Sequence, residues 1–277
     1  MTDVLAIPPE ALGRGTRIAV RVVPDMPALT LAFAEALLAE YRAAKAAGRG
    51  TVVFIIPVGP VGQYDVLARL CAEQDVSLAD LLMIGMDEYL TPAGDRIPET
   101  DPLSFRGHMR RHMTALMPAG RAPRIVFPDP HALDEIPRLI ARHGGVDVAF
   151  GGVGIAGHIA FNEPPEPGEI VDVEAFAQRP TRVQRLTRET RTINSVTATR
   201  GAIDLIPEYA VTVGMQEILG ARKLRLFLNR IWQTAIVRKM LHGPVTPTVP
   251  ASYAQRHPDC ALVVTEEVTR MPGATLA

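Results

Sequence analysis

The sequence predicts an α/β protein, built on a mostly parallel sheet with helices on both faces. Segments typical of strands alternate with segments typical of helices along most of the 277 residues. Several strand segments, such as VVFII at 52–56, are short and apolar at every position, as in parallel strands that are buried on both faces. No repeat, low-complexity tract or linker divides the chain, so we expect a single α/β domain over residues 1–277.

Local patterns justify the elements in order. The first strand, RIAVRVV at 17–23, is β-branched and alternating, and the helix after it, at 27–48, has apolar residues at helical spacing and ends at a glycine. Short apolar runs predict the later strands, at 51–58, 81–90, 124–130, 146–157, 209–215, 223–229 and 260–268. Helical spacing, with glycines at several ends, predicts the later helices at 59–74, 104–117, 134–145, 215–222 and 231–243.

The composition excludes several classes of protein. Charged residues make up 21% of the chain and the formal net charge is −1, so nucleic acid is not expected as a partner. The apolar runs are too short to span a bilayer and the N-terminal segment lacks the pattern of a signal peptide. We therefore expect no membrane association and a cytoplasmic location.

Metal binding finds little support in the sequence. The two cysteines, Cys71 and Cys260, form no metal-binding pattern. His108 and His112 have the i, i+4 spacing of ligands on a helix, but the surrounding RGHMRRHM is strongly basic, which disfavours a cation. We expect a solvated helix face there and no metal site.

Ligands of parallel α/β sheets bind at the carboxyl ends of the strands. This rule selects the loops after the strand segments 51–58, 81–86 and 146–150. The first loop, GPVGQY, precedes a helix N-terminus, but it holds no Ser, Thr or Lys and is a poor phosphate cradle by composition.

The second loop begins MDEYL, with Asp87 and Glu88 at the end of an apolar run. A carboxylate in this place can act as a general base or acid. The alternative is that Asp87 caps the next element.

The third loop reads GGVGIAGHIAFNEP at 151–164. From Gly152 the glycine spacing is G-x-G-x-x-G, but the Pro-rich segment that follows interrupts the helix of a dinucleotide site. Glu163 lies close enough in sequence to orient the ring of His158 and set its tautomer. The alternatives are a structural histidine and a surface glutamate.

Three segments together resemble the glucosamine-6-phosphate deaminase/isomerase family, which is grouped with the 6-phosphogluconolactonases. They are MDEYL at 86–90, GGVGIAGHIAFNEP at 151–164 and GPVTPTVPAS at 243–252, and the order and spacing match from about residue 17 to residue 268. GHIAFNEP is specific to the deaminase branch. The resemblance implies a modified Rossmann-like fold and an amino-sugar deaminase and isomerase of the hydrolase class acting on C–N bonds.

The resemblance also implies the roles of individual residues. Asp87 would be the base for the C2 proton, His158 would open the sugar ring, and Glu163 would orient His158, without organic cofactor or metal. The substrate contacts expected around them are Gly59, Gly62, Glu88, Gly154, Gly157, Asn162, Arg230 and Trp232. Both a monomer and a homo-oligomer stay open, as does regulation through the segment that holds Arg182 and Arg185.

The chain departs from the family pattern at several positions. Ala156 stands where the family has an aspartate that supports the histidine. The loop after 51–58 is about two residues shorter and lacks hydroxyls, Val196 replaces a phosphate-binding arginine, and Gln233 takes the place of a lysine, with Arg230 and Trp232 new beside it.

Because these losses fall together on phosphate-directed features, we expect an amino sugar without the usual phosphate, or an otherwise non-standard one. A sugar-lactone hydrolase or isomerase on the same scaffold, and a non-catalytic sugar-binding sensor, are the alternatives.

Overall fold

A computed structural model describes residues 3–274. The strands are β1 (Ala19–Val23), β2 (Val52–Ile56), β3 (Leu81–Gly85), β4 (Asp87–Tyr89), β5 (Arg124–Val126), β6 (Val148–Gly151), β7 (Arg182–Arg185), β8 (Tyr209–Thr212), β9 (Lys223–Leu228) and β10 (Cys260–Thr265). The α-helices are α1 (Met26–Ala46), α2 (Gln63–Glu73), α3 (Phe105–His112), α4 (Glu135–Arg142), α5 (Val173–Ala177), α6 (Arg188–Ala198), α7 (Met215–Leu219), α8 (Thr234–His242) and α9 (Glu266–Thr269).

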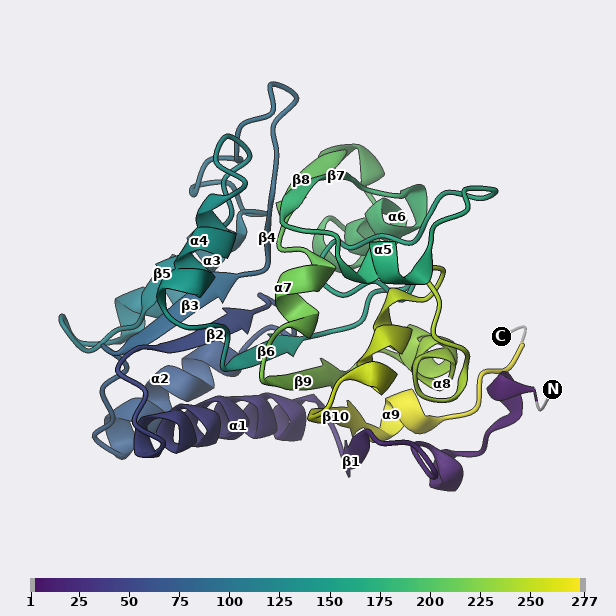
Figure 1. The fold of residues 1–277 in the computed structure, drawn as a ribbon, viewed down its shortest axis with the longest axis horizontal. Helices are drawn as coiled ribbons and strands as arrows, with labels where there is room; N and C mark the ends of the chain where they lie inside the picture. Colours follow the sequence, from purple (N-terminus) through teal and green to yellow (C-terminus); the bar gives the residue numbers. More distant parts are fainter. Residues whose placement is uncertain (1–2, 275–277) are drawn as a thin grey trace.

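Seven of these strands form one parallel sheet, in the order β1-β10-β9-β6-β2-β3-β5 (Figure 1). The interior strand β2 is buried at every position, because helices cover both faces. Side chains of Val52, Phe54 and Ile56 pack with α1, α2 and α3 on one face, whereas Val53 and Ile55 pack with α4, α7, α8 and α9 on the other. The predicted mostly parallel sheet with helices on both faces is confirmed.

A second, antiparallel sheet stands above the carboxyl edge of the first, in the order β4-β8-β7 (Figure 1). Met86 joins the two sheets, because its N–H donates to the carbonyl of Ile56 at 2.9 Å and its carbonyl accepts from the N–H of Val213 at 2.7 Å. A small apolar cluster that includes Tyr89 and Phe161 lies under this second sheet.

The second sheet corrects the sequence-based assignment at three places. The segment 81–90, expected as one strand, divides at Met86 into β3 and β4 of different sheets. The strand expected at 209–215 pairs in the second sheet, and β7 and α6 were not predicted at all. β7 and α6 are polar (RVQR and RETRTINSVTA), so they carry no apolar stripe to read. The short helix α5 was not predicted either, and the end of the segment 260–268, expected as strand, forms α9.

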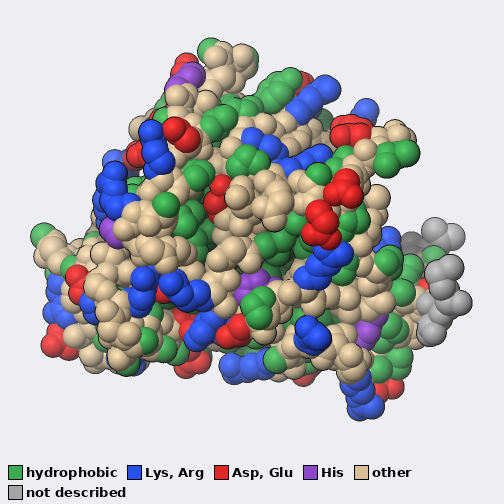
Figure 2. All heavy atoms as spheres, viewed as in Figure 1, with side chains coloured by type: hydrophobic (Ala, Val, Ile, Leu, Met, Phe, Trp, Pro, Cys, Tyr) green, Lys and Arg blue, Asp and Glu red, His purple; other side chains and the backbone are tan. Residues whose placement is uncertain are grey.

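Charged side chains of both signs are interspersed over the face shown in Figure 2, which fits the near-neutral net charge. Among residues 3–274, no helix is both long enough and apolar enough to cross a bilayer.

Candidate active site

A cavity of about 410 Å³ opens at the carboxyl end of the parallel sheet. The loops after β2, β3 and β6, which the strand-end rule selected, all contribute to its walls, together with the loop after β9 and with parts of α3 and α6. The cavity therefore lies where ligands of parallel α/β sheets bind.

Asp87 is the first residue of β4, and its half-buried side chain lines this cavity. Burial first, and then the negative charge of Glu88, raise the pKa of the Asp87 carboxyl to about 8. A carboxyl with such a pKa can take up or release a proton near neutral pH, which is the property required of a general base or acid.

His158 and Glu163 form a buried pair on the loop after β6. The Nδ1 atom of His158 lies 3.1 Å from Oε2 of Glu163, and the N–H of Thr187 donates to the other carboxylate oxygen at 3.3 Å. Burial alone would raise the pKa of Glu163, but His158 and hydrogen bonds from Thr190 and Thr187 outweigh it and hold that pKa below its ordinary value. An ionised Glu163 beside Nδ1 therefore favours the tautomer that carries its proton on that nitrogen.

Gly154 lets the imidazole of His158 lie directly against the main chain. A Cβ atom at residue 154 would overlap the Nε2 edge of the ring. A tight turn brings the two residues together, because Gly154 N donates to His158 O at 2.9 Å and Gly157 N donates to Gly154 O at 2.9 Å. Gly157 has a φ of +84°, which favours glycine. The glycine-rich segment is thus a turn that holds a histidine at the cavity.

The other expected substrate contacts divide into two groups. Gly59, Arg230 and Trp232 line the cavity, as Gly154 does. Three other residues lie outside its walls, and each has a structural place: Gly62 caps α2 with a φ of +104°, Gly157 forms the turn, and Asn162 is buried and donates to the carbonyls of Ile159 and Val213.

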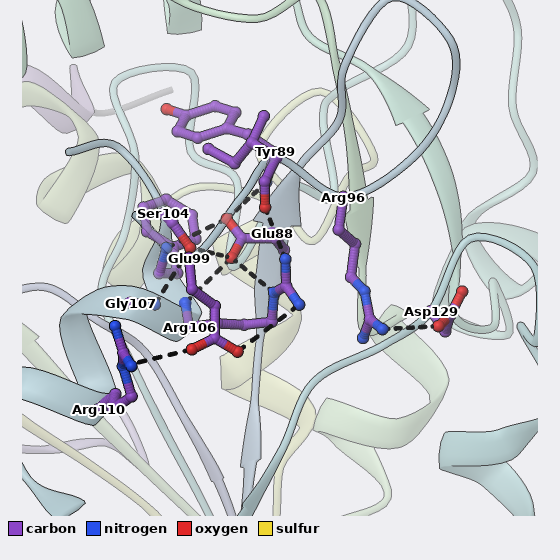
Figure 3. A network of polar contacts seen from close by, with 11 residues as sticks. Glu88, Tyr89, Arg96, Glu99, Ser104, Arg106, Gly107, Arg110 and Asp129 are labelled. Atoms are coloured by element: carbon purple, nitrogen blue, oxygen red, sulfur yellow. Dashed lines mark hydrogen bonds and ion pairs between the residues drawn. The ribbon is translucent and has the colours of Figure 1, made fainter. Parts of the chain in front are cut away.

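Glu88 is also outside the cavity walls, although it was expected to contact the substrate. Side chains of consecutive strand residues point to opposite faces, and Asp87 takes the cavity face. The Glu88 side chain is fully buried on the other side, where it accepts hydrogen bonds from Ser104 and Arg106 (Figure 3).

Two helices contribute cavity residues that the sequence analysis missed. From α6, Asn194 donates to the hydroxyl of Tyr89 at 2.9 Å, and both side chains line the cavity. From α3, His108 lines it too, so the expected solvated helix face is wrong at that residue. Burial, His112 and Arg111 lower the pKa of His108 to about 4, which leaves its imidazole neutral at pH 7. Tyr89 could have been predicted as a cavity residue, because it lies two residues after Asp87 in MDEYL and side chains two apart on a strand share a face.

The structure also places Val196 and Gln233, the two residues that replace the basic residues of the family pattern. The Val196 side chain is 61% exposed and is not among the residues that line the cavity. Gln233 is buried, its Oε1 accepts from the N–H groups of Asn229 and Arg230, and its Nε2 donates to the carbonyl of Val153 at 2.7 Å. Its amide is therefore used within the protein.

Metal ligands do not come together in the part of the chain that the structure describes. Over residues 3–274, no three side chains of His, Cys, Asp or Glu are placed so that they could hold a metal ion.

Sequence relatives of this chain are curated as glucosamine-6-phosphate deaminases. The protein of Streptomyces coelicolor is 32% identical over 252 residues, which cover 88% of this chain and 89% of the relative. The protein of Lachnoclostridium phytofermentans is 30% identical over 209 residues, which cover 74% and 82%. No family model matches the sequence.

Solved structures show the same fold. A monomeric glucosamine-6-phosphate deaminase is 24% identical with a TM-score of 0.72, and the match covers 92% of this chain and 100% of that one. The 6-phosphogluconolactonase from Trypanosoma cruzi is 15% identical with a TM-score of 0.65, and the match covers 91% and 96%.

The close approach at Gly154 generates a prediction. Gly154→Ala forces the His158 ring away from the main chain, at a cost of about 1–3 kcal/mol and a melting temperature lowered by several degrees. Calorimetry measures the change in melting temperature, and a crystal structure of the variant shows whether the imidazole has left its place beside Glu163.

Gly50→Ala is the matched control, because a Cβ at Gly50 meets no atom within 4 Å. An unmoved His158 ring in Gly154→Ala, with both variants equally stable, would contradict this account of the loop.

Proposed function

We propose, from the premise that the chain belongs to the glucosamine-6-phosphate deaminase family, that it isomerises an aldose amino sugar to a ketose and releases ammonia. The observation that carries the proposal is the meeting of two proton-transfer groups at one cavity. Asp87 approaches from the second sheet, and His158, with Glu163 behind it, approaches from the loop after β6. A base and a separately oriented imidazole are the groups that such a reaction requires.

The chemistry follows in balanced steps. As the sugar ring opens, the proton of the C1 hydroxyl passes to His158, and the resulting imidazolium, which Glu163 stabilises, gives a proton to the ring oxygen. Asp87 removes the proton from C2 and delivers it to C1, and a proton passes from the ammonium nitrogen to the C1 oxygen, so the aldehyde and the ammonium group become an alcohol and a protonated imine. Water then adds to the imine carbon and ammonia leaves. One water is consumed for each ammonia released, so we propose the hydrolase class for the reaction.

We further propose that the substrate lacks the 6-phosphate. The loop at 57–61 offers no hydroxyl to a phosphate, and Pro60 has no N–H to donate. The amide of Gln233 is already used within the protein, and the imidazole of His108 is neutral. A charge-assisted hydrogen bond contributes about 1.5–3 kcal/mol, so the loss of two would weaken binding of a phosphorylated sugar roughly a hundredfold to ten-thousandfold.

Arg230 and Trp232 complete this wall of the cavity. Arg230 is exposed and Trp232 is half-buried. We assign to Trp232 the apolar surface on which the unsubstituted end of the sugar packs. Arg230 is an exposed cation two residues before Trp232, so the two candidate substrates must be compared directly.

A sugar-lactone hydrolase is the second candidate. The His158–Glu163 pair could activate a water molecule for attack on a lactone, and this reaction would not need a base for a C2 proton. Ammonia release and the requirement for Asp87 separate the two candidates.

The first prediction from this proposal concerns the substrate. A coupled assay for ammonia, run with glucosamine and with glucosamine 6-phosphate, should give a kcat/KM at least tenfold higher for glucosamine. Asp87→Asn should lower it by about 10²-fold or more, because the base is removed.

Preference for the phosphorylated sugar would contradict the proposed substrate and leave the deaminase standing. Lactone hydrolysis without ammonia would favour the second candidate. Sugar binding with no turnover of any of these compounds would contradict an enzymatic role.

The second prediction concerns pH. Asp87 must be ionised to accept a proton, and its raised pKa means that it loses its own proton only near pH 8. The ¹³C carboxyl signal of labelled aspartate that is absent from Asp87→Asn should therefore titrate near pH 8. In the wild type, kcat/KM should rise with pH up to this value.

An Asp87 signal that titrates near pH 4, as an exposed carboxyl does, would contradict this prediction.

A further inference from the structure

Glu88 is fully buried, and its carboxylate accepts five hydrogen bonds. Oε1 accepts from the N–H groups of Tyr89 at 3.0 Å and Phe105 at 3.1 Å. Oε2 accepts from the Ser104 hydroxyl at 2.8 Å and from two groups of Arg106, the main-chain N–H at 3.0 Å and Nε at 3.2 Å (Figure 3). So many donors around one buried carboxylate hold it as an anion.

These contacts do more than cap a helix. α3 already has its own N-cap, because the Ser104 oxygen accepts from the N–H of Gly107 at 3.1 Å. Glu88 reaches this first turn from another element, strand β4, whose first residue is Asp87. Ser104, Phe105 and His108 all line the cavity. Glu88 thus connects one wall of the cavity to the strand that carries Asp87.

A chain of alternating charges extends from Glu88 toward the surface. Arg106 pairs with Glu88 at 3.2 Å and lies 3.9 Å from Glu99, which in turn pairs with Arg110 at 3.4 Å (Figure 3). The Nη2 atom of Arg106 also donates to the carbonyl of Ile97 at 2.6 Å. The guanidinium is therefore fixed on the side of Glu88 that faces away from the cavity.

We propose that Glu88 is a positioning residue of this site, which fastens the α3 wall to the strand of Asp87 and maintains a negative potential at the Asp87 carboxyl. The proposal rests on the proposed function, in which Asp87 is the base. The raised pKa of Asp87, to which burial contributes most and Glu88 next, supports it.

Other titratable groups also face the cavity around Asp87. Tyr89 is neutral, because burial first and then the charge of Asp87 raise the pKa of its hydroxyl. His158 with Glu163, the neutral His108 and the cation of Arg230 face the same cavity from the loop after β6, from α3 and from the loop after β9. On the far side, the groups that face Glu88 are Arg106 and, beyond it, Glu99.

The decisive variant is Glu88→Gln, which removes the charge and keeps the size of the side chain. Asp87 should then ionise more easily, so the rise of kcat/KM should move to lower pH by about one unit. KM should increase at the same time, because the α3 wall is held less firmly. The ionisation of the substrate amine is common to wild type and variant and cancels in the comparison.

Glu99→Gln is the matched control, since it makes the same chemical change at an exposed position farther along the charge chain. It should keep the wild-type pH profile and KM. A merely structural role of Glu88 would lower the melting temperature and the amount of active protein, but it would not move the pH profile.

Arg106→Gln tests the same potential with the opposite sign if Glu88→Gln does not fold. Loss of the Arg106 guanidinium leaves the negative charge of Glu88 uncompensated, so the rise of kcat/KM should move to higher pH. A wild type that releases ammonia, with all folded variants at the wild-type pH profile, would overturn the proposal for Glu88. A wild type inactive on every amino sugar would instead overturn the proposed function.

Discussion

The pairing of Met86 with two sheets is the contact on which the site depends. Its N–H donates to the carbonyl of Ile56, the last residue of β2 in the parallel sheet, and its carbonyl accepts from the N–H of Val213, the residue that follows β8 of the second sheet. The chain therefore changes sheet within one residue and continues extended. Because an extended chain sends consecutive side chains to opposite faces, the Asp87 side chain lines the cavity and the Glu88 side chain is buried in the protein interior.

The two adjacent carboxyls show how environment separates their chemistry. Glu88 accepts five hydrogen bonds, one of them from the guanidinium of Arg106, whereas no hydrogen bond to the Asp87 carboxyl is found among the described residues 3–274. The hydrogen-bonded Glu88 carboxylate carries a negative charge. Burial and this charge both make ionisation of Asp87 costly. When the surroundings of two acids differ in this way, one acid can act as a fixed charge and the other can carry a proton.

The sequence predicted the parts of the fold and site that local patterns carry. Apolar runs gave the parallel strands, and the strand-end rule gave three of the loops that line the cavity, including those of Asp87 and His158. It missed α6 and the second sheet, because polar segments such as RVQR are stabilised by partners distant in sequence. It also misplaced Glu88 and His108, since neither the division of a strand at Met86 nor the packing of α3 leaves a local signal.

Different loops hold the proposed proton-transfer groups and the opposite wall of the cavity, so substrate recognition can differ while the proton-transfer groups are kept. Asp87, His158 and Glu163 are held by the strand junction at Met86 and by the turn at Gly154. The opposite wall is built by the loops after β2 and β9, where Pro60, Arg230 and Trp232 lie. Neither of these loops supplies a hydrogen bond to the His158–Glu163 pair among the bonds found in the described residues. A change of substrate can therefore be made on that wall without disturbing the geometry of the proposed acid and base.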